Sequence, residues 1–439
     1  MLALRLTRRA RPAVQLRRLL VASASAGTGF LLLCALGHAM THPGSPGTSF
    51  LRLTWCAAPL AATVHFAVAV SRTDPGTRPR PGLAAIGLGP YRLMAVSATT
   101  TALSTLLGSM LALLFFLHLR GDLTGMPFDG AAADFLAASE PLPLPAALTL
   151  LTLVPAAASL AVAFTVRPRE TKPPAEGPRR YGRFGAYGGS GARETFGAYG
   201  RFGARMRRTE PASSRAATVS TEPAGSRVAE AAPDAPTAPP SGLPWGTAIL
   251  AAGLAVEAYA STATTPSAPM PGGLPTGPAA VLVGWALTAI GLALAGPGLT
   301  HLCGRLLQSL RPGALRLLAG RVLMEEATRI GRPLGVVCAV ASAAYAMAVL
   351  HDPDADGRAL GPLTTLGATV VTGCAVATLI TAAVEARQAR AGTTAALLRL
   401  GAPPTTLRGA AALRAGALLA AFGPLTLVVA ELAALPLAR

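Results

Sequence analysis

Nine apolar runs, each close to the length of a membrane span, constrain this chain more than any other feature. A bilayer core of roughly 30 Å is crossed by about 20 helical residues, and an isolated segment in lipid satisfies its backbone hydrogen bonds only as a helix. The strict alternation of a membrane β-barrel does not occur. The sequence therefore predicts an all-α, polytopic membrane helix bundle of nine or ten transmembrane helices. The predicted spans are 19–40, 51–71, 93–117, 144–166, 243–260, 279–299, 334–350, 363–383 and 411–436.

A second feature is an internal repeat at an offset of about 312 residues. An even number of spans separates the starts of the two copies, so both copies cross the membrane in the same direction. Parallel repeats of this kind form two related halves around one central pathway. The sequence therefore predicts two parallel pseudo-repeats. The repeated segments are 3–6 with 314–317, 19–40 with 334–350, 51–71 with 363–383, 83–92 with 395–404, and 93–117 with a segment near 411–436.

These features divide the chain into four parts. Residues 1–166 form a first unit of four spans, and residues 300–439 form a second unit of three spans that lacks the fourth. Residues 243–299 supply two connecting spans. The segment 167–242 is rich in Pro, Gly, Arg and Ser. We expect it to be a disordered, basic, cytoplasmic linker because such a composition cannot bury a core.

The net charge of +18 is distributed as in a membrane protein. Arginines precede the first span and fill the loops 72–92, 300–333 and 384–410, whereas acidic residues dominate 118–143 and 351–362. This positive-inside pattern predicts a cytoplasmic N-terminus. We expect the basic segments to face the anionic lipid bilayer, and we expect no nucleic-acid partner. The composition, rich in Arg and Ala with a single lysine, favours a bacterial plasma membrane and a multi-pass protein within it.

The motifs of common enzymes are missing from the sequence. A P-loop ATPase needs a lysine inside a glycine frame, but the only lysine, Lys172, lies in ETKPPA. HExxH and GxSxG motifs and CxxC pairs are missing as well. We therefore expect no enzymatic activity, no catalytic residues, no metal site and no cofactor, and we expect a partner to bind any ATP.

Three ionisable residues, His65, Glu257 and Glu431, lie inside predicted spans. Such residues are costly in lipid and are functional candidates by default. His65 is interpreted either as a neutral, hydrogen-bonded helix contact, which we favour, or as part of a proton relay. Glu257 and Glu431 lie near the outer ends of their spans, where snorkelling toward the membrane surface explains both.

The cytoplasmic segment between the second and third span of each unit has the pattern of a short helix that ends at a glycine. One interpretation is a rigid helix that docks into a partner and passes motion to the flanking spans. The other is an interfacial helix that only closes the loop. The candidate residues are Leu83, Ile86, Leu88, Gly89 and Arg92 in segment 83–92, and Leu397, Leu398, Arg399, Leu400 and Gly401 in segment 395–404.

The segment EARQARAGTTAALLRLGAPPTTLRGAAALRAG (385–416) resembles the motif between spans two and three of FtsX-like, MacB-type ABC transporter permeases. RPRPGLAAIGLGPYRLMAV (78–96) is a weaker match, and LALRLTRRARPAVQLRRLL near the N-terminus resembles the basic amphipathic helix with which such permeases begin. The resemblance implies a permease subunit driven by a dimer of separate P-loop ATPase subunits, through coupling helices at 83–92 and 395–404. It also implies substrates such as lipids, peptides or antibiotics at the outer face.

Two departures from this family leave alternatives open. The family usually carries a large extracytoplasmic domain, but the outer segments 41–50 and 351–362 are short, and the second unit lacks a fourth span. One alternative is a non-transporting membrane scaffold or regulator derived from such a permease. Another is a proton-coupled secondary transporter that uses His65, Glu257 or Glu431.

Overall fold

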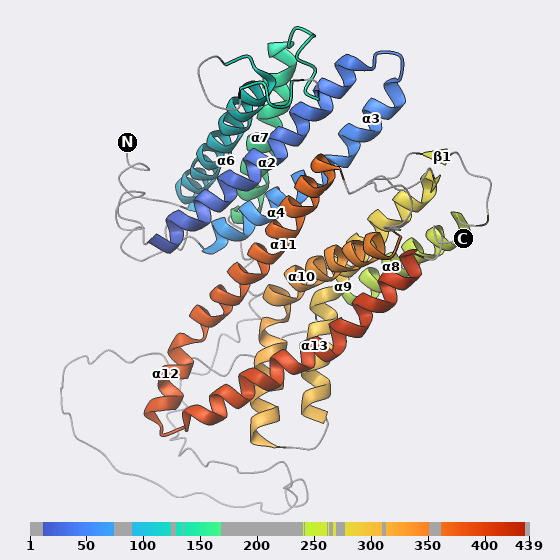
Figure 1. The fold of residues 1–439 in the computed structure, drawn as a ribbon. Coiled ribbons are helices and arrows are strands. Elements are labelled where there is room, and N and C mark those ends of the chain that lie inside the picture. The colour runs from blue at the N-terminus through green and yellow to red at the C-terminus, as the bar shows by residue number, and fades with distance from the viewer. Residues whose placement is uncertain are drawn as a thin grey trace, which may run out of the picture. The chain divides into compact units, whose positions relative to one another are not determined.

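The fold is almost entirely helical. The computed structural model describes residues 12–73, 90–123, 129–133, 135–167, 240, 242–260, 262, 267–268, 277–309, 313–350 and 361–434. Within these residues, nine helical segments are long and apolar enough to cross a membrane (Figure 1). The prediction of an all-α, polytopic membrane bundle is therefore confirmed. In the described part of the chain, the only strands are the two-residue β1 (Ser267–Ala268) and β2 (Gly277–Pro278), which pair antiparallel.

The described helices are grouped by the part of the chain in which they lie. The first unit contains α2 (Pro12–Thr41), α3 (Pro46–Trp55), α4 (Ala57–Thr73), α6 (Pro90–Arg120) and α7 (Leu144–Val166). The connecting helices are α8 (Gly242–Ala260) and α9 (Ala279–Ser309). The second unit contains α10 (Ala314–Leu350), α11 (Pro362–Ala389), α12 (Ala391–Arg399) and α13 (Pro404–Ala434). The predicted linker 167–242 lies almost entirely outside the described residues, as does the start of the N-terminal basic segment.

Most helices extend beyond their predicted spans; α9, for example, continues to Ser309 rather than ending at 299. The run at 51–71 is part of a longer segment that begins at Pro46 and breaks between α3 and α4 near Cys56. α10 begins at Ala314, well before the predicted run at 334–350. Residues 314–333 consist mainly of Ala, Leu, Arg, Met and Glu, which are strong helix formers, so a segment expected to be a loop continues the helix instead.

The two units pack their helices in the same order. In the first unit α2 packs against α6 and α4, and in the second unit α10 packs against α13 and α11. A buried cluster in the first unit joins Leu33 of α2, Phe116 of α6 and Leu151 of α7, while α9 packs against α8 and α10. Large side chains such as Leu107 and Leu419 are exposed, as expected for helices that face lipid.

The units meet where α4 packs against α11. Thr63 Oγ1 lies 3.9 Å from Cys374 Sγ and 2.9 Å from Oγ1 of Thr28 in α2. In the alignment of the repeated segments 51–71 and 363–383, Thr63 corresponds to Ala375, so its contact is with the residue that precedes its counterpart. A contact one position away from exact correspondence still places the α4–α11 crossing at similar points of the two repeats.

The segment after α6 folds back onto the first unit. Leu136 is buried in the same cluster as the α2 and α6 side chains. The buried Arg120 guanidinium donates to the carbonyl oxygen of Glu140, and its Nε lies 3.2 Å from Asp122 Oδ2. The described part of the acidic segment 118–143 is therefore held against the ends of these helices.

Candidate functional site

The turn between α11 and α13 contains the short helix that the sequence predicts. α12 (Ala391–Arg399) has no buried residue, and Figure 1 shows it at the far end of α11, where the chain reverses into α13. The side chains of Leu398 and Leu400 are 47% and 84% exposed, and Arg399 is exposed as well. An apolar and basic surface that no other described element covers is thus presented beyond the packed helices.

A glycine ends α12 in a defined geometry. Gly401 has a φ of +87°, in the left-handed region that favours glycine. Its N–H donates to the carbonyl of Leu398 at 3.1 Å, and the N–H of Ala402 donates to the carbonyl of Leu397 at 3.0 Å. This pair of bonds is a Schellman motif. It fixes the direction in which the chain leaves α12 toward Pro404, where α13 begins.

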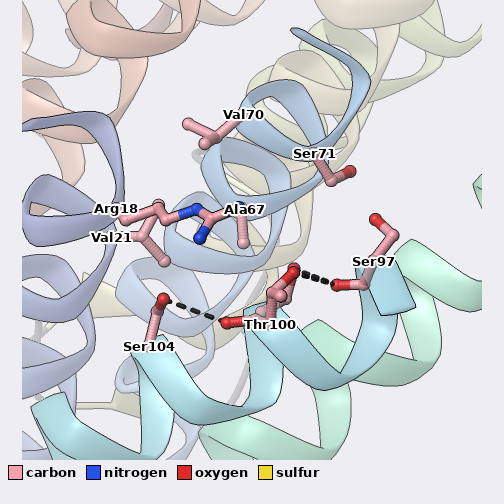
Figure 2. A pocket seen from close by; sticks show the side chains of 9 residues that line it. Arg18, Val21, Ala67, Val70, Ser71, Ser97, Thr100 and Ser104 are labelled. Atoms are coloured by element: carbon pink, nitrogen blue, oxygen red, sulfur yellow. Dashed lines mark hydrogen bonds between the residues drawn. The ribbon is translucent and has the colours of Figure 1, made fainter. Parts of the chain in front are cut away.

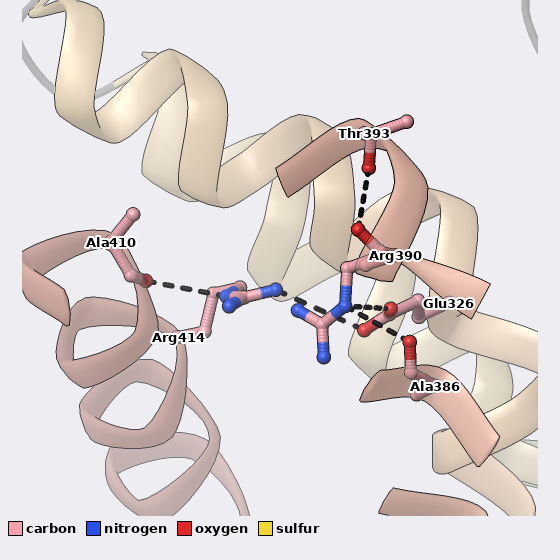
Figure 3. Close-up of polar contacts among 6 residues, drawn as sticks. All are labelled: Glu326, Ala386, Arg390, Thr393, Ala410 and Arg414. Carbon is pink, nitrogen blue, oxygen red and sulfur yellow. Dashed lines mark hydrogen bonds and ion pairs between the residues drawn. The ribbon is translucent and has the colours of Figure 1, made fainter. Parts of the chain in front are cut away.

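The start of α12 is fixed by Arg390, which lies between α11 and α12. Its carbonyl oxygen accepts two hydrogen bonds from the first turn of α12, one from the N–H of Thr394 and one from the hydroxyl of Thr393, both at 2.9 Å. Its side-chain Nε donates to the carbonyl of Ala386 at 3.1 Å. The same Nε lies 2.7 Å from Oε1 of Glu326 in α10, as Figure 3 shows. The guanidinium therefore ties the α11–α12 junction to a neighbouring helix.

Glu326 is the centre of a buried ion cluster. Glu326 is only 6% exposed, and its second carboxylate oxygen, Oε2, lies 3.9 Å from Nη1 of Arg414 in α13. Arg414 is oriented by its own Nε, which donates to the carbonyl of Ala410 at 3.3 Å. One carboxylate therefore faces guanidinium groups from both sides of the α12 turn (Figure 3). The Arg390 contact is close, whereas the Arg414 contact lies at the long end of ion-pair distances, so both flanks of α12 face one carboxylate of α10 and the Arg390 flank lies nearer to it.

Glu326 was not predicted as a site residue, because the segment 300–333 was expected to be a loop. The helical spacing of the apolar residues around it nevertheless indicated a buried position. Ala319, Leu323, Glu326 and Ala327 are all buried and have the spacing of a single helix face. The adjacent Glu325 falls off this face and is exposed. An acidic residue in register with an apolar stripe predicts a buried partner of opposite charge.

The corresponding segment of the first unit is mostly not described. Leu83, Ile86, Leu88 and Gly89 lie outside the described residues. Arg92 lies in the first turn of α6 and is exposed. The structure therefore places one of the two predicted coupling segments in full.

Glu257 does not snorkel, which corrects the interpretation drawn from its position in the sequence. It is 1% exposed and lies between α8 and α9, where Thr288 Oγ1 donates to its Oε1 at 2.9 Å. A Cβ on Gly284 would collide with the Glu257 side chain, so the glycine is what allows the carboxyl group to fit. Among the described residues, Oε2 of Glu257 has no hydrogen-bond partner.

The other two intramembrane residues lie elsewhere. Glu431 is exposed near the end of α13 and accepts a bond from the Tyr345 hydroxyl at 3.0 Å. His65 is half-buried in α4. No hydrogen bond between described residues links His65, Glu257 or Glu431 to one another, so the three do not form a connected relay in the described part of the chain.

The described residues hold no group of three or more His, Cys, Asp or Glu side chains arranged to bind a metal ion. No family model, no curated protein and no solved structure matches this chain. The assignment of a function therefore rests on the site geometry.

Proposed function

We propose that this chain is the membrane-spanning permease subunit of an ABC transporter of the FtsX-like type, and that α12 is a coupling helix that docks onto a separate P-loop ATPase subunit. In this proposal the arginine-rich end of the bundle faces the cytoplasm of a plasma membrane. One observation carries the proposal. α12 has no buried residue, yet both of its flanks, at Arg390 and Arg414, lie in ion-pair contact with the buried carboxylate of Glu326.

This arrangement suits the transmission of motion. A helix that only closed a loop would not need rigid attachment to a third helix. Because Glu326 joins α10 to the ends of α11 and α13, a push on α12 moves these three helices together. α11 also packs against α4 of the first unit, so displacement of α11 reaches the contact between the two units.

The surface of α12 fits a docking role. Leu398 and Leu400 offer apolar side chains for a groove, and Arg399 offers a charge that pairs with acidic groups at the rim of that groove. A short amphipathic helix that enters a groove binds through a few such anchors. A non-transporting scaffold would share the fold but would not need an ATPase at α12.

The test is a pull-down of the tagged, full-length chain from its native membrane in mild detergent, followed by mass spectrometry. We expect a P-loop ATPase in stoichiometric amount with the unaltered chain. Leu398→Asp and Arg399→Glu should each remove it while the thermal unfolding of the chain is unchanged. Arg321→Glu is the matched control, because Arg321 is an exposed arginine on α10 away from the α12 turn.

Two results would contradict the proposal. One is a folded chain that reproducibly carries no ATPase, which would favour the scaffold. The other is an ATPase that remains bound to both α12 variants, which would place the docking surface elsewhere.

A further inference from the structure

A polar recess lies among α2, α4 and α6 of the first unit, away from the α12 turn. One guanidinium and five hydroxyl groups line it, while Val21 and Ala67 contribute apolar walls. Figure 2 shows the Arg18 side chain extending across the recess toward α4, opposite the hydroxyls of α6. The polar lining residues are Arg18, Ser71, Ser97, Thr100, Thr101 and Ser104.

The hydroxyl groups are arranged as a flexible ligand-binding surface. Thr100 and Ser104 donate to the carbonyls of Ser97 and Thr100 at 2.9 and 3.0 Å, within their own helix. Such bonds are local and exchangeable, because a serine or threonine hydroxyl rotates readily and its oxygen also accepts. A ligand in the recess would thus meet rotatable hydroxyls on one side and a cation on the other.

This combination recognises a phosphate group. A guanidinium presents several N–H donors in a planar fork that matches phosphate oxygens, and hydroxyls complete the coordination as neutral donors. None of the described residues that line the recess is acidic, so these side chains do not repel an anion. The neighbouring Arg17 lies outside the lining, and its Nη1 donates to Thr73 Oγ1 at 3.1 Å.

An exposed apolar track continues from the hydroxyls. Leu103 and Leu107 follow Thr100 and Ser104 at helical spacing, and both are exposed. The same face of α6 continues to Leu111, which is exposed as well. A molecule with a phosphate in the recess would therefore place any hydrocarbon attached to it along this track.

We propose that the recess binds the phosphate-containing headgroup of a membrane phospholipid, with an acyl chain lying along the leucines of α6. The site lies where the basic ends of the helices meet the apolar part of the bundle, which is where a lipid phosphate is found. It belongs to the first unit alone, because α13 has no serine or threonine between Thr406 and Thr426. This inference requires only the membrane fold, and it does not depend on docking at α12.

The test uses the purified, full-length chain in detergent, with bound lipid counted by native mass spectrometry during titration with phosphatidylglycerol. Arg18→Gln should weaken binding about tenfold, the loss expected when one charge-assisted contact of about 1.4 kcal/mol is removed. Arg17→Gln is the matched control. It removes the same charge one residue away, outside the lining, and should change binding little.

A second variant and a second ligand complete the design. Thr100→Val combined with Ser104→Ala keeps the charge of Arg18 and should also weaken lipid binding. An unchanged affinity in this double variant would overturn the proposal. Equal losses of affinity in Arg17→Gln and Arg18→Gln would overturn it as well, because they would show that the lipid is attracted by the overall positive charge and not by the recess. Inorganic phosphate alone should compete poorly. Binding of inorganic phosphate as tight as that of the lipid would assign the recess to free phosphate instead.

Discussion

The first and second units share a helix order but join their helices with different chemistry. In the first unit the contacts of α2 with α6 and of α6 with α7 include neutral hydroxyl bonds, although Arg17 of α2 also donates to the Thr73 hydroxyl of α4. Ser25 of α2 donates to the carbonyl of Thr105 in α6 at 2.8 Å, and Ser109 of α6 donates to the carbonyl of Leu151 in α7 at 3.1 Å. The second unit adds the buried charge of Glu326, paired with guanidinium groups from two further elements.

This difference indicates which unit keeps its helices in a fixed arrangement. A hydroxyl that loses its partner on another helix returns to a carbonyl of its own helix, so a neutral contact is replaced at little cost. A buried carboxylate has no such substitute, and removal of one partner leaves an uncompensated charge. We infer that the second unit has the more rigid polar contacts at the α12 turn, and that the hydroxyl contacts of the first unit are more readily exchanged.

The largest effect is expected for Glu326→Ala. This change leaves Arg390 and Arg414 close together without their carboxylate, and the free energy of unfolding should fall by about 3 kcal/mol. The measurement is an unfolding titration in mixed micelles, together with hydrogen exchange of α12, which should become faster. Glu325→Ala is the matched control, since Glu325 is exposed and pairs only with the exposed Arg321. Equal losses in the two variants would remove the basis for a rigid second unit.

A smaller loss of stability is expected for an alanine substitution at a glycine of α6, and none at a glycine of α13, the helix that occupies the same place in the second unit. Gly108 of α6 lies against Ala22 and Ser25 of α2, and a Cβ at this position would collide with backbone atoms. Gly416 of α13 has no atom near the position of an added Cβ. Gly108→Ala should therefore destabilise the bundle by about 1–3 kcal/mol, whereas Gly416→Ala should be neutral or slightly stabilising. The same titration measures both, and a costly Gly416→Ala would show that α13 is packed as closely as α6.

Periodicity and length were sufficient to predict the helical class and most of the spans, because both depend on local sequence. A short helix that stops at Gly401 was also predictable, since a Schellman motif is a local signal, although the helix is Ala391–Arg399 and begins four residues before the predicted segment 395–404. Its anchoring was not, because the contact from Glu326 to Arg414 depends on how distant helices pack. The predicted start of α10 was wrong, because the charged segment 314–333 was expected to be a loop although its residues favour a helix.

Glu257 shows a second limit of sequence analysis. Its position four residues from the end of α8 suggested an exposed carboxylate. Whether the side chain faces outward or toward a neighbour depends on the α8–α9 packing, and the glycine at 284 creates the space that it occupies. A glycine opposite an acidic residue becomes informative only after the two helices are aligned.

The smallest loss of stability is expected for a variant that tests the contact between the units. Thr63→Val removes the hydroxyl that contacts Thr28 within the first unit and Cys374 across the interface, and we expect a loss of about 0.6 kcal/mol, the average for such bonds in membrane helices. Thr369→Val is the control, since Thr369 is exposed and bonds only to the carbonyl of Thr365 in its own helix. A double-mutant cycle of Thr63→Val with Cys374→Ala then isolates the part that crosses between the units. A coupling energy of zero would mean that Thr63 and Cys374 touch without stabilising the contact between the units, and motion passed from α11 to α4 would then depend on apolar packing alone.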